Sequence, residues 1–284
     1  MQGLTRAKLS NLDKILYPEL TLSKADIIEY YIKAAPWMLP HLQDRALVRT
    51  RYPDGVYGES FYEKDSPKGA PEWVKTFTKY SASVGKDTSY VVCNDLDTLI
   101  WLANLAALEL HIPLSTINAV EESDTLLFDV DPEPPAGLSE SVTTALILRN
   151  YLEALGLEPF VKTSGKKGIH VVVPLVPGYS FTDTSSFVHA VAIELASKNP
   201  LIVSERNQTN IPGTVLLDYP QNSERGTMIA PYSLRAVREA TVSTPLEWDE
   251  LPKLRPFDWN IFNVLDRKGD PWKGLFEERF KLPI

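Results

Sequence analysis

The fold is decided by the run Thr125-Leu126-Leu127-Phe128-Asp129-Val130-Asp131-Pro132 and by the elements that follow it. Residues 125–130 form an apolar strand, and residues 139–155 have helical periodicity that Gly156 ends. Two further strands are predicted over 159–162 and 169–173. A second helix, capped by Asp183 or Thr184 and ended by Asn199-Pro200, leads to a last strand over 215–217. The order is therefore β-α-β-β-α-β.

That order is the split βαβ, or ferredoxin-like, arrangement, in which the first and last strands lie side by side in one antiparallel sheet. The fold class expected is therefore mixed α/β (α+β), with a ferredoxin-like or RRM-like βαββαβ palm. Polymerase palms use this scaffold, and so do RNA-binding modules without catalysis. The fold by itself leaves the function open.

The amino-terminal part predicts an α/β subdomain of its own. Ser23-Lys24-Ala25-Asp26 has capping-box spacing before a helical pattern that we expect Pro36 to stop. Strands over 46–52 and 61–64 flank a turn at Pro53-Asp54-Gly55 and predict a hairpin. A second helix, capped by Asp95, is expected to run through Leu110 and to have His111 at its end.

The 284 residues are 44% apolar, which is ample for one large domain with a buried core. We expect a single domain over 1–284, made of an N-terminal subdomain (1–110), a catalytic palm (111–245) and a packed tail rich in Pro and Trp (246–284). The lone Cys93 sits in an apolar run and is expected in the core. The sequence has no run of eighteen apolar residues and no apolar stretch at its start, so we expect a cytoplasmic protein that does not contact membrane.

The net charge of −8 argues at first sight against nucleic acid as a partner. The charge is unevenly placed, however: residues 1–90 hold 13 Lys and Arg against 11 Asp and Glu, and the remainder holds 16 against 26. An acidic remainder suits a site for metal cations, although surface solubility explains most such surpluses.

Two carboxylates end the first strand of the palm. Asp129 and Asp131 point to the same face because side chains alternate along a strand, and their repulsion is relieved when divalent cations lie between them. Asp218 ends the last strand and lies beside them if the fold is right. Three such carboxylates suit a two-metal site, whereas Asp-x-Asp before a proline is also common in ordinary turns.

A glycine-flanked basic turn, Thr163-Ser164-Gly165-Lys166-Lys167-Gly168-Ile169-His170, joins the second and third strands of the palm. Its N–H groups, hydroxyl and cations are suited to phosphate oxygens, and a plain hairpin with solvated lysines is the alternative. The turn lacks the spacing of a Walker loop. Arg235 offers a guanidinium that can clamp a phosphate, although single arginines usually lie on the surface without such a role.

The two aspartates, the basic turn and Asp218 resemble, in order, the three motifs of the archaeo-eukaryotic primase superfamily. More closely, nearly the whole chain resembles the polymerase domain of bacterial and archaeal ligase D-type end-joining enzymes, with matching stretches at 9–14, 49–55, 217–222 and 242–246. The resemblance implies a primase-polymerase fold. It also implies a template-dependent polymerase (nucleotidyltransferase) that adds nucleotides, preferably ribonucleotides, at gaps and broken DNA ends in non-homologous end joining.

The resemblance also implies the site residues. A metal triad of Asp129, Asp131 and Asp218 would hold Mn²⁺ or Mg²⁺ in a two-metal site. The nucleoside triphosphate would contact His111, Ser164, Lys167, Gly168, His170 and Arg235, with His111 near the sugar; a core-packed His111 is the alternative. A pocket for the DNA 5′-phosphate would use Asn11, Lys14 and Lys24, with Phe61 or Tyr62 stacked on a base. The expected partners are gapped or broken DNA, nucleoside triphosphates, an end-binding protein and a separate DNA ligase.

A surface loop over 79–89 is the expected counterpart of the family's end-bridging loop. Two features depart from the family's pattern. Residues 210–214 lack an arginine that relatives often carry before the third carboxylate. No ligase or nuclease motif follows the polymerase-like region.

Two rival functions come from other classes. A non-catalytic nucleic-acid-binding module is disfavoured because three clustered carboxylates would repel phosphate unless metal intervened. A metal-dependent nuclease or phosphohydrolase also uses clustered aspartates, and the phosphate-binding character of the basic turn disfavours it.

Overall fold

Two sheets, each with its own pair of helices, organise the chain. The computed structural model describes residues 6–81, 85–208 and 211–283. Two units are distinguished by their internal contacts: unit 1 comprises Met1–Asn118, Ile229–Ser243 and Trp259–Arg267, and unit 2 comprises Ala119–Met228, Thr244–Asp258 and Lys268–Ile284. Each unit is thus built from segments far apart in the sequence.

The sheet of unit 2 confirms the predicted β-α-β-β-α-β order. Its strands lie in the order β11-β12-β8-β10-β9-β14, and β8 pairs antiparallel with both β12 and β10. The first and last strands of the predicted motif are therefore neighbours. The strands are β8 (Thr125–Pro132), β9 (Phe160–Thr163), β10 (Ile169–Pro174), β11 (Ile202–Val203), β12 (Val215–Leu217) and β14 (Pro245–Leu246).

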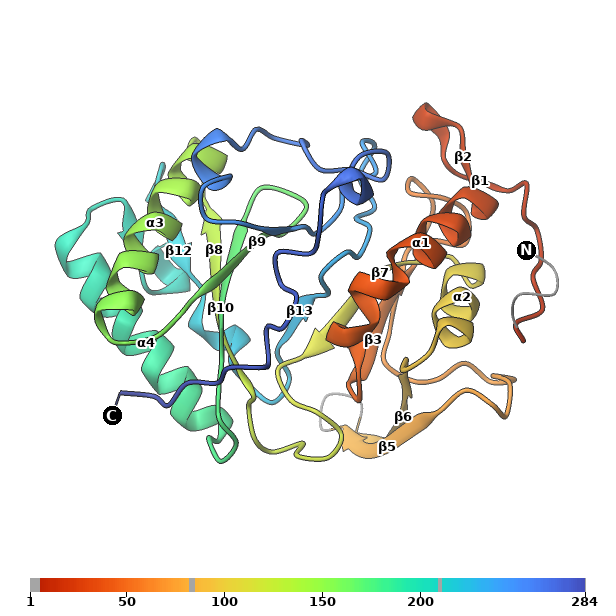
Figure 1. The fold of residues 1–284 in the computed structure, drawn as a ribbon, viewed down its shortest axis with the longest axis horizontal. Helices are drawn as coiled ribbons and strands as arrows, with labels where there is room; N and C mark the ends of the chain where they lie inside the picture. The colour runs from red at the N-terminus through yellow and green to blue at the C-terminus, as the bar shows by residue number, and fades with distance from the viewer. Residues whose placement is uncertain (1–5, 82–84, 209–210, 284) are drawn as a thin grey trace. The chain divides into compact units, whose positions relative to one another are not determined.

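Helices α3 (Leu138–Ala154) and α4 (Phe181–Lys198) lie on one side of this sheet (Figure 1). Each turns an apolar face inward, with Leu148 and Leu195 among the buried residues. The cap of α4 is Ser180, so the prediction of Asp183 or Thr184 was wrong. The Asp183 N–H donates to Ser180 Oγ, and the Ser180 N–H donates to the Asp183 carboxylate, which places Asp183 at the third position of a capping box.

The second sheet has the strand order β13-β7-β3-β6-β5. Strand β4 pairs with the carboxyl-terminal half of β3. The pairing of β3 with β4 confirms the predicted hairpin. A separate two-stranded ribbon, β1-β2, precedes the first helix. The bounds are β1 (Ile15–Tyr17), β2 (Leu22–Ser23), β3 (Ala46–Arg51), β4 (Phe61–Glu63), β5 (Thr76–Ser81), β6 (Lys86–Val92), β7 (Ala107–Pro113) and β13 (Thr227–Ile229).

Helix α1 (Lys24–Leu42) begins with the predicted capping box but does not stop at Pro36. It continues through Pro36 and Pro40 to Leu42, so that prediction was wrong. Each proline removes one helix hydrogen bond, yet Met38 and Leu42 are completely buried beyond Pro36. The burial of that apolar face outweighs the lost hydrogen bonds and maintains the helix.

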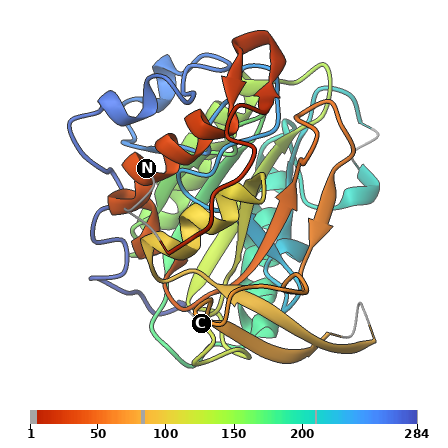
Figure 2. The same ribbon diagram turned by 90° about the vertical axis from the view of Figure 1, so that its right-hand side faces the viewer.

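Helix α2 (Leu96–Asn104), capped by Asp95 as predicted, ends earlier than expected and packs beside α1 (Figure 2). Ala106 has φ of 57°, which breaks the helical path, and β7 begins at Ala107. His111 therefore lies in a strand and not at a helix end. The error came from Ala103, Ala106, Ala107 and Leu110, which fit helical spacing, whereas the alternation of Leu108, Leu110 and Ile112 with Glu109 and His111 fits the strand that the structure shows.

The remaining segments are short 3₁₀ turns and an irregular tail. The turns cover Pro18–Leu20, Arg206–Gln208, Tyr219–Gln221, Leu251–Lys253 and Val264–Asp266. The indole N–H groups of Trp248 and Trp272 donate to the carbonyl oxygens of Pro159 and Val161, which fixes the tail of unit 2 against β9.

Cys93 is completely buried, as predicted for a core residue, and burial raises the pKa of its thiol well above the usual range. Across the ranges that the structure describes, no helix has both the length and the apolar character needed to cross a membrane.

Candidate active site

The three predicted carboxylates lie on adjacent strands of unit 2. Asp129 and Asp131 are on β8, and the backbone N–H of Asp218, directly after β12, donates to the carbonyl oxygen of Asp129 at 3.0 Å. The register pairs Leu216 with Asp131 and Leu217 with Val130, so Asp218 stands opposite Asp129. Opposed residues of an antiparallel pair share one face of the sheet. Residues 129, 131 and 218 therefore share that face.

The third carboxylate, Asp218, is paired with Arg206, a residue that the sequence reasoning did not single out. Its Nε donates to Asp218 Oδ1 at 2.7 Å and its Nη2 to Asp218 Oδ2 at 2.5 Å. The Asp218 side chain is 5% exposed, whereas that of Arg206 is 63% exposed. The hydrogen bonds and the charge of Asp218, and then the charges of Asp129 and Asp131, raise the pKa of the Arg206 guanidinium.

Asp131, the second aspartate of β8, is partly buried. Burial is the main cause that raises the pKa of its carboxyl, the Lys167 ammonium opposes the shift, and Asp218 reinforces it. A Cβ on Gly168 would lie 2.9 Å from Asp131 Oδ1 and 3.0 Å from the carbonyl oxygen of Val130. Glycine is therefore required at 168 by the close approach of the turn to the carboxylate.

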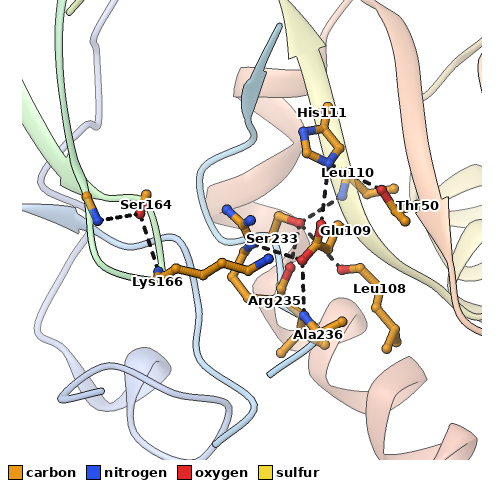
Figure 3. Close-up of polar contacts among 12 residues, drawn as sticks. Thr50, Leu108, Glu109, Leu110, His111, Ser164, Lys166, Ser233, Arg235 and Ala236 are labelled. Atoms are coloured by element: carbon orange, nitrogen blue, oxygen red, sulfur yellow. Dashed lines mark hydrogen bonds and ion pairs between the residues drawn. The ribbon is translucent and has the colours of Figure 1, made fainter. Parts of the chain in front are cut away.

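The turn between β9 and β10 is organised by its own serine. Ser164 Oγ accepts hydrogen bonds from the N–H groups of Gly168 (3.1 Å) and Lys166 (3.3 Å), the second of which is drawn in Figure 3. Gly165 has φ of 75°, the left-handed conformation that the tight turn needs. Lys167 Nζ donates to the Pro132 carbonyl oxygen at 2.8 Å, which holds this ammonium at the end of β8.

His170 completes the cluster of unit 2. It pairs with Asp129 in the register of β10 and β8, and its Nε2 lies 3.4 Å from Asp129 Oδ1. The imidazole is thus next to a predicted metal ligand and directly follows the turn that is predicted to bind phosphate. The structure brings together Asp129, Asp131, Ser164, Lys167, Gly168, His170 and Asp218, all within unit 2.

The other two predicted nucleotide ligands, His111 and Arg235, lie in unit 1 and share one buried carboxylate, Glu109 (Figure 3). Glu109 Oε1 accepts from Arg235 Nε at 3.0 Å and from the Ala236 N–H at 3.1 Å, and Glu109 Oε2 lies 3.6 Å from His111 Nε2. Sequence reasoning missed Glu109, which is 5% exposed. A glutamate inside an apolar strand was the available signal, because an ionised side chain is buried only with partners.

The predicted 5′-phosphate residues gather at the start of unit 1. Lys24 N donates to the Lys14 carbonyl oxygen, and Lys14 N donates to that of Asn11, so the three residues share one loop and helix start. Lys14 Nζ is 2.6 Å from Asp54 Oδ1, and Lys24 Nζ donates to the Ser10 carbonyl oxygen. Burial, then the nearby Lys14 and then Arg51 lower the pKa of Lys24.

The two predicted stacking residues are exposed on β4: Phe61 is 40% and Tyr62 is 56% exposed. Tyr62 contacts His111 edge to face, with ring centroids 5.9 Å apart. Of the expected bridging loop, residues 79–81 and 85–89 belong to the β5–β6 hairpin, and 82–84 lie outside the described residues. Of the stretch 210–214, residue 210 also lies outside them.

The donor set of the carboxylate cluster fits a hard divalent cation, since it supplies carboxylate oxygens from one face of two neighbouring strands. In the described part of the chain, however, no group of three His, Cys, Asp or Glu side chains is arranged to hold a metal ion. Both oxygens of Asp218 are bonded to Arg206. Asp218 can serve as a metal ligand only after that guanidinium moves away.

The chain is similar to known proteins over most of its length. The profile of the family described as LigD, primase-polymerase domain, matches residues 23–272. Among relatives, the multifunctional non-homologous end joining protein LigD of Mycolicibacterium smegmatis is 34% identical over 95% of this chain and 36% of its own length. The bifunctional LigD of Bacillus subtilis is 35% identical over 98% of this chain and 46% of its own length.

A solved structure also resembles the chain closely. The polymerase domain of Mycobacterium tuberculosis ligase D, in complex with DNA, has a TM-score of 0.89 and 33% identity, covering 97% of this chain and all of that one. The chain spans less than half the length of these two LigD relatives. The family match covers most of the sequence, and the chain belongs to the LigD primase-polymerase domain family.

Proposed function

We propose that this protein is a metal-dependent, template-directed nucleotidyltransferase that extends DNA at gaps and broken ends in non-homologous end joining. The observation that carries the proposal is the position of Asp218 opposite Asp129, on the strand beside Asp129 and Asp131. Membership of the family and the likeness to a polymerase domain bound to DNA support it.

The proposed metal ligands are Asp129, Asp131 and Asp218. Divalent cations held there, Mn²⁺ or Mg²⁺ in a two-metal site, would lower the pKa of an attacking 3′-hydroxyl and neutralise charge on the triphosphate. Arg206 has to release Asp218 before that carboxylate can serve. Its high exposure makes such a movement inexpensive, because little packing is lost.

The protein's own residues would handle the nucleotide. Lys167 is held at the end of β8 by the Pro132 carbonyl oxygen and is suited to triphosphate oxygens, as is the Ser164 hydroxyl. His170 lies beside Asp129, where it can donate to a phosphate oxygen and stabilise the leaving pyrophosphate. Gly168 allows the turn to approach the carboxylates.

His111 and Arg235 would complete the nucleotide site, with Glu109 fixing the direction of both side chains. Arg235 is suited to a phosphate because a guanidinium is a planar cation with several donors that can bind two phosphate oxygens at once. We propose His111 for the sugar, and a preference for ribonucleotides belongs to this part of the proposal.

On the DNA side, Asn11, Lys14 and Lys24 would bind a 5′-phosphate, and Phe61 or Tyr62 would stack on a base. The proximity of Lys24 to Lys14 and Arg51 supports an anion site, because their mutual repulsion is relieved by a bound phosphate. The proposed protein partners are an end-binding protein and a separate DNA ligase. The ligase would seal the nick that remains after this chain has filled a gap.

Primer extension tests the proposal. Purified protein receives a primed DNA with a one-nucleotide gap, a 5′-phosphate, Mn²⁺ and either ribonucleoside or deoxyribonucleoside triphosphates. A lengthened primer supports the transferase, a shortened primer indicates a nuclease, and an unchanged primer with retained DNA binding indicates a binding module. Asp129→Asn should abolish extension while leaving DNA binding intact.

Lys14→Ala tests the 5′-phosphate pocket separately. It should weaken binding to 5′-phosphorylated gaps about tenfold, since one charged contact is lost, and barely change binding to unphosphorylated gaps. Equal losses on both substrates would remove the assignment of Lys14 to the terminal phosphate.

A further inference from the structure

The ion pair of Arg206 with Asp218 joins two short 3₁₀ turns of unit 2. Arg206 begins the turn Arg206–Gln208, and Asp218 directly precedes the turn Tyr219–Gln221. The Arg206 side chain is mostly exposed, so packing alone does not set its direction. The way in which its turn is held therefore affects how firmly the guanidinium binds the carboxylate.

His189 of helix α4 contacts a sequence neighbour of each partner in that ion pair. Its Nε2 lies 2.6 Å from Oε1 of Glu205, the residue before Arg206. Its ring stacks on that of Tyr219, the residue after Asp218, with centroids 3.9 Å apart and an interplanar angle of 19°. An ionised carboxylate only accepts hydrogen bonds, so Nε2 carries the proton and donates to Glu205. His189 is thus bonded to one turn and stacked on the other.

Helix α4 and the Tyr219–Gln221 turn form a fixed platform for this imidazole. The helix packs on the sheet by an apolar face that includes the buried Val188 and Leu195. Asn222, which is completely buried, accepts from the Leu127 N–H at 2.9 Å and donates to the Leu127 carbonyl oxygen at 2.6 Å. These bonds hold the end of the turn to β8. The carboxylate that precedes this turn therefore keeps its place without His189.

Glu205 connects that platform to the other turn. Its carbonyl oxygen accepts from the Gln208 N–H at 2.9 Å, which closes the turn that Arg206 begins, and its carboxylate is held by His189. The two hydrogen bonds of the guanidinium require alignment with both oxygens of Asp218. Without the hydrogen bond from His189 the turn can shift, and the ion pair weakens.

We propose that His189 is a positioning residue whose hydrogen bond to Glu205 aligns the Arg206 guanidinium on the third carboxylate. The carboxylate cluster then binds a divalent cation less tightly, because the cation has to displace a well-aligned guanidinium. The statement about the cation rests on the proposed function, in which Asp218 is a metal ligand. The alignment itself needs no metal, nucleotide or DNA, so it can be measured on the protein alone.

The test compares two variants of one residue. His189→Phe keeps a ring on Tyr219 and removes the donor to Glu205, whereas His189→Gln keeps a donor and removes the ring. Ser186→Ala, which changes an exposed residue of the same helix, is the control. Arg206→Gln combined with His189→Phe completes a double-mutant cycle, which shows whether His189 acts through Arg206.

The first measurement is the rate at which the Arg206 Nε–H exchanges with water, followed by ¹H–¹⁵N NMR without metal. The signal is assigned by its absence in Arg206→Gln. In wild type this N–H donates to Asp218 at 2.7 Å. Exchange should be about three- to fivefold faster in His189→Phe, and within about twofold of wild type in His189→Gln and the control. An unchanged rate in His189→Phe, or an equal acceleration in His189→Gln, would overturn the proposal.

The second measurement is Mn²⁺ affinity by isothermal titration calorimetry without DNA or nucleotide. His189→Phe should raise the affinity about two- to threefold, and should leave it unchanged in the Arg206→Gln background, where no guanidinium remains to be aligned. An equal gain in both backgrounds would overturn the proposal. Wild-type primer extension is measured in parallel. If His189→Phe accelerates the exchange while wild type neither binds Mn²⁺ nor extends a primer, the positioning of Arg206 survives and the proposed function fails.

Discussion

The Arg206 guanidinium holds both oxygens of the Asp218 carboxylate, at 2.7 Å and 2.5 Å, beside Asp129 and Asp131. Two charge-assisted hydrogen bonds to a buried carboxylate are strong, but one partner is exposed to water. The same carboxylate is the proposed third metal ligand. Arg206 and a cation therefore compete for Asp218.

Arg206→Gln should raise the affinity for Mn²⁺ about three- to tenfold, because the cation no longer displaces a guanidinium. Isothermal titration calorimetry with MnCl₂, without DNA or nucleotide, measures this directly. Lys198→Gln removes the same charge from the end of α4 and should leave Mn²⁺ affinity within about twofold of wild type. Weaker binding by Arg206→Gln would show that Arg206 supports the site.

Gly168→Ala should disturb Asp131 by steric contact. The added Cβ would stand 2.9 Å from Asp131 Oδ1 and 3.0 Å from a backbone oxygen that cannot move freely. We expect a loss of about 1–3 kcal/mol in unfolding free energy and about tenfold weaker Mn²⁺ binding. Gly269→Ala is the control, since nothing lies within 4 Å of its Cβ position. If both variants bind Mn²⁺ equally, the close contact has no role at the site.

Glu109→Gln should weaken nucleotide binding and leave Mn²⁺ affinity unchanged. Glu109 fixes Arg235 through Nε and lies beside His111, so the neutral amide leaves Arg235 less firmly oriented. KM for ATP in primer extension should rise about five- to tenfold, with a smaller change in kcat. Glu239→Gln, which removes the partner of the exposed Arg238, should behave as wild type. An unchanged KM would exclude a positioning role for Glu109.

The contacts of Asp44 predict that part of the stability of the protein is lost at acid pH. Hydrogen bonds from Asn94 first, and then from Lys75, lower the pKa of its carboxyl from 3.8 to about 2. A carboxyl whose folded pKa is depressed stabilises the protein above its unfolded pKa and loses that contribution as pH falls through the folded value. Asp44→Asn should cost about 1 kcal/mol at pH 6, after allowance for solvent screening, and nothing below pH of about 2. Urea unfolding across that range measures it, and a difference independent of pH would contradict the assignment.

The palm could be predicted from the sequence because its elements differ clearly in period. Residues 125–132 form a short, mostly apolar strand, whereas α3 is a long amphipathic helix. Gly156, with a positive φ, follows the end of that helix. The opposition of Asp129 and Asp218 then followed from the connection rules of the βαββαβ motif, since these rules make the first and last strands neighbours. Local pattern and topology agreed there.

The errors occurred where tertiary packing overrides local preference. Pro36 reads as a helix end, yet the buried face of α1 on either side of it keeps the helix continuous. Ala106, in the left-handed region, ends α2 and gives no sequence signal because alanine favours helices. His111 was misplaced for that reason.

The missed site residues have a related cause. Arg206 lies in a short 3₁₀ turn without periodicity, and its pairing with Asp218 depends on where β11 and β12 place it. Glu109 lies in β7, and its contacts with Arg235 and His111 form only when the fold brings those side chains together.

The measurement that tests the central claim most directly is anomalous diffraction from crystals grown with MnCl₂ and a non-hydrolysable nucleoside triphosphate. We predict manganese peaks within about 2.0–2.4 Å of carboxylate oxygens of Asp129, Asp131 and Asp218, with Arg206 turned away from Asp218. Manganese bound elsewhere, with Arg206 still bonded to Asp218 beside a bound nucleotide, would contradict the account.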